Sequence, residues 1–82
     1  MQKPKTMTVI KMKDLVTYLF DDIKTLYYMI DSETTEEKVI VVFKPRSTAW
    51  NRFHGNDLEI CVTADSNEAL VKDVLKTLWL NL

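Results

Sequence analysis

The stretch KVIVVF, residues 38–43, is expected to form the middle strand of a sheet, because five apolar residues follow one another after its lysine. β-branched and aromatic side chains in so short a run favour a β-strand. Such a strand is apolar on both of its faces. We therefore predict a strand over about residues 38–44, with the neighbouring segments as its pairing partners.

The segments on either side also favour strands. Residues 26–31 carry two tyrosines, a methionine and an isoleucine, and the polar connector DSETTEEK then leads into the strand at 38–44. This pattern predicts a hairpin, although the same segment could extend a preceding helix. Residues 58–63 alternate apolar and polar side chains, which is typical of a strand with one buried and one wetter face.

A helix is predicted at each end of this strand region. Apolar positions recur at helical spacing from Val9 to Ile23, so we expect a helix over about 9–24 with Thr8 as its N-cap. A second helix is expected over about 67–80, capped by Asp65 or Ser66 with Glu68 in a loose capping box.

These elements define an α+β fold with the order α-β-β-β-α. We expect a three-stranded antiparallel sheet with both helices packed on one of its faces. With 82 residues, the chain is expected to form a single domain over 1–82, in which 1–7 are a flexible lead-in.

Composition excludes several classes of function. The formal net charge is −1, so the whole chain is not suited to binding a polyanion. One Cys and one His provide neither a disulfide nor a tetrahedral zinc site, so no cofactor or metal is expected and a cytoplasmic location is favoured. The lysine-rich first residues are too charged for a signal peptide or a membrane span.

The connection KPRSTAWNRFHGND, residues 44–57, is far longer than two neighbouring strands require. It holds residue types that are enriched in binding sites, namely Arg46, Trp50, Arg52, Phe53 and His54. We predict a binding loop here, with Trp50 either an exposed anchor or packed back onto the sheet. Trp79 is a further candidate binding residue, because Leu78, Trp79, Leu80 and Leu82 cannot all face the core.

The strand at 38–44 has a second consequence. If one of its faces meets the helices, the other presents apolar side chains alongside Cys61 and either Tyr27 and Met29 or their alternates. A segment of the chain, a partner protein or a second copy is expected to cover that face, unless it is a mildly apolar open surface of the kind that small domains tolerate.

The order of elements is similar to that of double-stranded-RNA-binding domains, but the similarity is limited to topology. The first hairpin loop reads SETTEE, and the last helix opens with Asp65 and Glu68, which would repel phosphate. The basic and aromatic side chains of residues 44–57 could still stack on single-stranded bases. His54, which follows Arg46 and Arg52 in the same loop, could act as a general acid or base, although the sequence shows no partner carboxylate for it.

We therefore expect a small non-catalytic protein–protein interaction domain, of the kind used as an accessory or inhibitory protein and suited to a phage or mobile element. Its binding surface is predicted to combine the 44–57 loop with the exposed apolar sheet face. The alternative is a small RNA-binding or RNA-cleaving module around His54. No membrane partner is expected.

Overall fold

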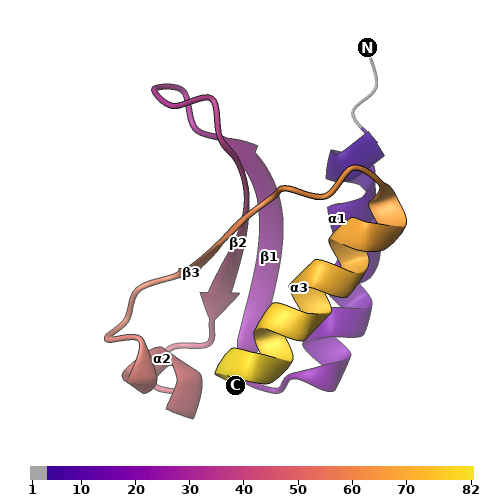
Figure 1. Cartoon of the computed structure of the whole chain (residues 1–82). Helices are drawn as coiled ribbons and strands as arrows, with labels where there is room; N and C mark the ends of the chain where they lie inside the picture. The colour runs from indigo at the N-terminus through magenta and orange to yellow at the C-terminus, as the bar shows by residue number, and fades with distance from the viewer. Residues whose placement is uncertain (1–3) are drawn as a thin grey trace.

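The computed structural model describes residues 4–82, and its elements follow the predicted order (Figure 1). A short additional helix lies between the second and third strands. The elements are α1 (Pro4–Leu19), β1 (Ile23–Ile30), β2 (Glu37–Phe43), α2 (Thr48–Arg52), β3 (Leu58–Cys61) and α3 (Asn67–Asn81). The fold is therefore a compact α+β arrangement, as predicted.

Helix α1 begins and ends five residues earlier than the predicted 9–24. Pro4 suits the first position of a helix, because its missing N–H has no partner there in any case, so Thr8 is inside the helix and not its cap. Residues 4–7, assigned to the flexible lead-in, form the first turn of α1, and 1–3 lie outside the described residues. Ile23 continues the apolar stripe numerically but belongs to β1.

The sheet has the order β1-β2-β3, and both pairings are antiparallel. Residues 26–30 pair with β2 residue by residue, from Leu26 opposite Val41 to Ile30 opposite Glu37, which confirms the hairpin over the extended helix. Its turn is closed by Asp31, whose carboxylate accepts backbone hydrogen bonds from Glu33 and Thr34. These bonds, that from Thr34 foremost, lower the pKa of Asp31.

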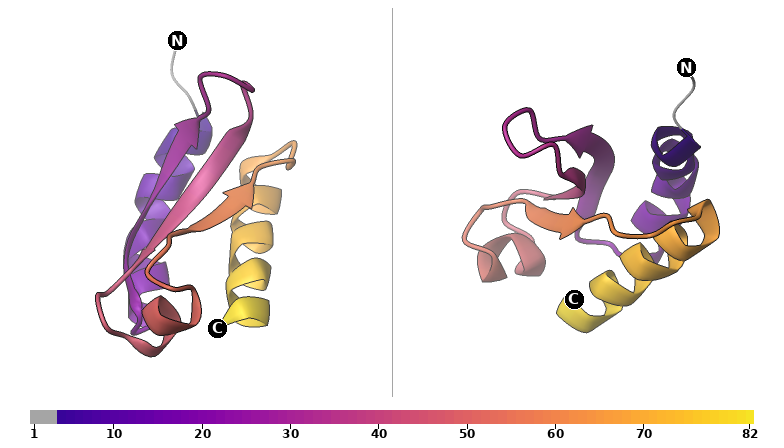
Figure 2. Two further views of the ribbon diagram at one scale, coloured as in Figure 1. Left: turned by 90° about the vertical axis from the view of Figure 1, so that its left-hand side faces the viewer. Right: turned by 45° about the horizontal axis from the view of Figure 1, so that its top comes forward.

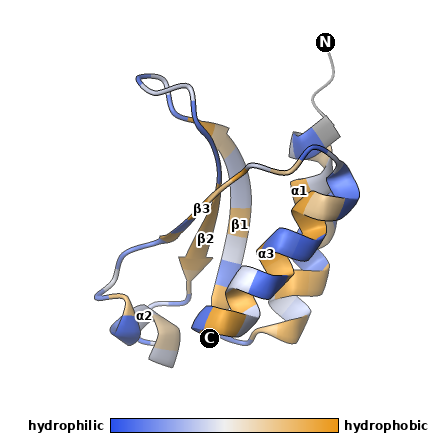
Figure 3. Cartoon of the chain, viewed as in Figure 1, coloured by the Kyte–Doolittle hydropathy of each residue, from blue (hydrophilic) through white to orange (hydrophobic). Residues whose placement is uncertain are grey.

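Both long helices cover one face of the sheet, as predicted, with α1 over the β1 side and α3 over the β3 side (Figure 2). Hydrophobic positions fill β2, whereas the hairpin tip is hydrophilic (Figure 3). The core is built from both helices and all three strands and includes Val9, Val16, Leu26, Val39, Val41, Ile60, Leu70, Val74 and Leu78. Ser66 caps α3 by accepting the Ala69 N–H at 3.1 Å.

Among residues 4–82, no helix lies over the opposite face of the sheet (Figure 2). The register places Tyr27 and Met29 on this face with Ile40 and Cys61, so β2 is apolar on both faces. Ile40 is nevertheless only 4% exposed, whereas Tyr27 is 47% exposed. Lys38 bonds Glu59 at 3.0 Å across the same face. Neighbouring side chains thus shield the middle of this face, and Tyr27 is its main accessible apolar group.

Candidate functional site

The connection between β2 and β3 is folded around α2 and not irregular. Ser47 caps this helix by accepting the Trp50 N–H at 3.1 Å. Asp22, in the turn between α1 and β1, accepts the Ala49 N–H at 2.9 Å. Backbone N–H groups of α2 thus donate to one side chain adjacent in sequence and to one distant in sequence, and these two bonds hold α2 beyond the end of the sheet. Residue types alone did not predict this arrangement.

The aromatic side chains of this connection point toward the core. Phe53 stacks on Phe43, with ring centroids 5.1 Å apart. Trp50 is half-buried and packs against the core residues. Gly55 has a φ of 80°, and a Cβ placed there would lie 3.2 Å from the Trp50 indole. Glycine at this position therefore allows the chain to turn closely past the indole.

The charged residues of the same connection remain at the surface. Arg46, Arg52 and His54 are exposed, and the Arg52 guanidinium donates to the Asn81 carbonyl at 2.8 Å. Arg46 and His54 have φ values of 67° and 57°, in the left-handed region. Among residues 4–82, no hydrogen bond or ion pair joins His54 to either arginine. Trp50 and Phe53 thus both pack against the core, whereas the three basic side chains are exposed to solvent.

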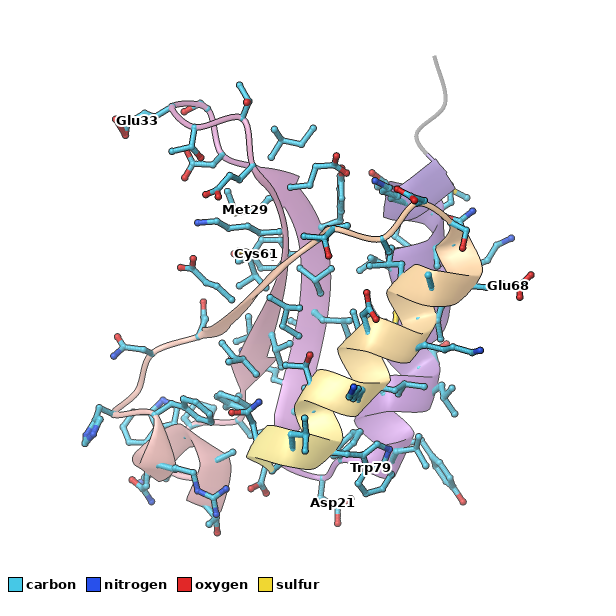
Figure 4. All side chains as sticks on the ribbon, viewed as in Figure 1. Asp21, Met29, Glu33, Cys61, Glu68 and Trp79 are labelled. Atoms are coloured by element: carbon cyan, nitrogen blue, oxygen red, sulfur yellow. The ribbon has the colours of Figure 1, made fainter. Side chains whose placement is uncertain are left out.

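A second candidate site lies beside α2, where α1 and α3 end. An open groove of about 430 Å³ is lined by Leu19, Phe20, Asp21, Asp22, Trp79 and Leu82. Trp79 is 63% exposed, and its ring lies 4.7 Å from that of Phe20. Figure 4 shows Trp79 and Asp21 close together at the bottom of the view. We call this site the Trp79 groove.

Of the residues that line the Trp79 groove, only Trp79 was predicted from the sequence to be a binding residue. Leu19, Phe20, Asp21 and Asp22 were assigned to the predicted first helix, where they carried no sign of a site. They reach Trp79 because α1 and α3 pack side by side and end at the same end of the molecule (Figure 1). No pattern within either segment could have revealed a contact between residues so distant in sequence.

The electrostatics of the Trp79 groove are negative. Asp21 and Asp22 line it, and the C-terminal ends of α1 and α3 lie beside it. A helix C-terminus carries a partial negative charge, which a basic residue in the last turn commonly offsets. Neither α1 nor α3 has a basic residue in its last turn. Asp22 also bonds α2, so the groove adjoins the 44–57 connection.

A polar cluster at the opposite end of the molecule ties α1 to the hairpin. The Glu37 carboxylate accepts hydrogen bonds from the Tyr28 hydroxyl at 2.6 Å and from the Lys5 ammonium at 3.1 Å. Burial, followed by this bond to Glu37, raises the pKa of Tyr28 from 10.0 to about 12. Each polar group of this cluster has a partner within the chain, so its geometry fits a structural tie.

Tyr28 makes the stability of the fold sensitive to high pH. Its pKa is raised in the folded chain, so its contribution to stability is complete below pH 10 and is lost as the pH rises toward about 12. In an absorbance titration, one tyrosine should ionise near pH 12, and Tyr28→Phe should remove that late step. A wild-type titration without that late step would contradict this assignment.

Other kinds of site find no support in the part of the chain that the structure describes. Across residues 4–82, no group of three or more His, Cys, Asp and Glu side chains is placed to hold a metal ion. No helix in that range is long and apolar enough to cross a membrane. No protein-family model matches the chain, and no curated protein or solved structure matches it significantly. The functional inference therefore rests on the geometry of the groove and the connection.

Proposed function

We propose that the protein is a small non-catalytic interaction domain, an accessory or inhibitory protein that binds another protein through the end where α2, the Trp79 groove and the helix C-termini meet. The observation that carries this proposal is the Trp79 indole, 63% exposed in a groove that also contains Leu19 and Phe20. Tryptophan is among the residues most enriched in binding hot spots, and exposed apolar patches commonly mark interaction sites.

The 44–57 connection contributes its polar side chains to the same surface. Arg46, Arg52 and His54 are exposed, and Arg52 reaches the end of α3 by donating to the Asn81 carbonyl. Arginine is the other residue type favoured in hot spots. The anchor in this proposal is Trp79, because Trp50 is committed in large part to the core. The open sheet face is a weaker candidate for a second contact, since Ile40 is shielded and only Tyr27 exposes much apolar surface.

A reducing, cytoplasmic location belongs to the same proposal. Cys61 is a free thiol exposed on the sheet face, and such a group persists where disulfide formation is not favoured. Packing and hydrogen bonds then hold the fold without a covalent link.

Site-specific photo-crosslinking tests the proposal directly. A photoreactive amino acid would replace Trp79 in one variant and Lys72, also exposed on α3, in a matched control. After nuclease treatment of a lysate, we expect a discrete protein adduct at position 79 and none at 72. With the partner purified, Trp79→Ala should weaken binding by about 30-fold, the loss typical of a hot-spot residue.

Three results would contradict the proposal. Equal crosslinking at both positions would indicate nonspecific contact, and an adduct that disappears with nuclease would identify RNA as the ligand. The second result would instead favour the RNA-binding alternative around His54. A Trp79→Ala variant that is folded and binds the purified partner normally would exclude the groove.

A further inference from the structure

The Trp79 groove combines aromatic rings with negative charge, a combination that suits a positively charged ligand. We infer that it receives a cationic side chain, an arginine or lysine, from the partner protein. This inference rests on the proposed function and specifies the chemistry of the contact. The guanidinium or ammonium group would lie beside Asp21 and the face of Trp79, with its alkyl stem against Leu19 and Phe20.

Charge is the first property of the Trp79 groove that favours a cation. Both acidic residues that line the groove, Asp21 and Asp22, contribute carboxylates, and no lining residue is basic. Within residues 4–82, no hydrogen bond or ion pair engages the Asp21 carboxylate, whereas one Asp22 oxygen accepts the Ala49 N–H. Asp21 is therefore the acidic side chain of the groove that is available to an incoming cation.

The helix ends strengthen the same field. The C-terminus of α1 lies at the groove with no basic residue in its last turn. The end of α3 is partly compensated, because Arg52 donates to the Asn81 carbonyl at 2.8 Å. Asp21, Asp22 and the end of α1 are thus the main sources of negative potential, and an anionic or phosphate ligand would be repelled.

The aromatic wall selects for a cation with an apolar stem. The Phe20 and Trp79 rings lie 4.7 Å apart at an angle of 58°, and much of the Trp79 indole remains exposed. The face of an indole attracts a cation through its quadrupole, and tryptophan does so best among the aromatic residues. The alkyl part of arginine or lysine can pack on apolar walls while its charged end stays near water. A purely apolar side chain would leave the Asp21 carboxylate without a partner.

Titration with small probes tests this inference without knowledge of the partner. N-acetyl-arginine amide and N-acetyl-citrulline amide have nearly the same shape, but only the first is charged. In a nitrogen–proton correlation spectrum, the arginine probe should shift the Trp79 indole N–H signal and saturate at millimolar concentration. Citrulline should bind about fivefold more weakly, the ratio expected for an exposed cation–π contact beside a carboxylate.

Variants then locate the contact. Asp21→Asn should reduce the affinity for the arginine probe about threefold or more, and added salt should have a smaller effect on this variant than on the wild type. Asp65→Asn removes an exposed carboxylate that precedes α3, at the opposite end from the groove, and should leave the titration unchanged. Trp79→Leu removes the reporting indole, so its binding would be followed through the Asp21 backbone amide, where we expect little response.

The outcomes separate this inference from the proposed function. Equal affinity for the arginine and citrulline probes, or no response to arginine in the millimolar range, would overturn the inference that the ligand is cationic. A specific crosslink at position 79 would in that case still support the interaction domain. Arginine binding that depends on Asp21, without any protein crosslink at position 79, would support the cationic site and reject the proposed partner.

Discussion

Replacing Trp50 with alanine is expected to lower the free energy of unfolding by about 3 kcal/mol. Truncation of a fully buried aromatic side chain costs about 3–5 kcal/mol. Trp50 is half-buried, so its cost should lie at the lower end of that range. For a domain of this size, the melting temperature should fall by roughly 15 °C. The indole rests on the core and on Gly55, so its loss leaves a void at the end of the sheet. Thermal and denaturant melts measure the change.

The matched control is Asn51→Ala, the next residue of α2. Asn51 is exposed and its side chain makes no hydrogen bond within the described residues, so stability should change by less than about 0.5 kcal/mol. Once the partner is available, Trp50→Ala should bind it normally per folded molecule. A Trp50→Ala variant with full stability and a binding loss of 2 kcal/mol or more would reverse this assignment and make Trp50 the anchor.

Leu78→Ala is expected to destabilise the protein by about 3 kcal/mol. Leu78 is fully buried on the face of α3 that meets the core, and leucine truncations at such positions cost about 2–5 kcal/mol through lost burial and the cavity left behind. A urea melt should show a lower midpoint with an unchanged slope, because the surface exposed on unfolding stays nearly the same.

Leu80→Ala is the control for this variant, because it makes the same chemical change two residues further along α3. Leu80 is 75% exposed, so its truncation should alter stability by less than about 0.5 kcal/mol. Comparable losses from both variants would show that the C-terminal turn of α3 is oriented differently or buried in an assembly. The pair therefore also tests whether Leu80 belongs to a surface that meets a second copy.

Local patterns were sufficient for most of the fold. The apolar run at residues 38–43 predicted β2, and the alternation of apolar and polar residues at 58–63 predicted β3. Both patterns are visible in a few consecutive residues. Side-chain chemistry predicted Asp65 or Ser66 as the cap of α3, and the structure shows Ser66. The predicted bounds of α1 were wrong by five residues at each end. Pro4 can start a helix, and Ile23 pairs with Phe43 in the sheet instead of continuing the helix.

The candidate site was predicted less completely. The residue types in 44–57 indicated binding, but they could not indicate that Phe53 would stack on Phe43 or that Asp22 would hold α2 in place. Both contacts join segments that are distant in the chain. The composition of β2 predicted apolar side chains on its second face, yet Ile40 on that face is only 4% exposed, which the sequence did not indicate.

Local sequence patterns predicted the order of the three strands and two long helices, the two-faced central strand and a cap of α3 at Asp65 or Ser66, because these features depend on neighbours a few residues away. They missed α2 and wrongly placed the cap of α1 at Thr8. Which aromatic residue is accessible depends on the tertiary structure. Trp50 and Trp79 have the same intrinsic chemistry, but Trp50 meets the core and Gly55, whereas Trp79 stands beside Phe20 and Asp21 in an open groove. The difference arises from contacts between segments distant in the chain, since α2 packs Trp50 against the core while the packing of α1 beside α3 brings Phe20 to Trp79. Such contacts are not apparent from either segment alone.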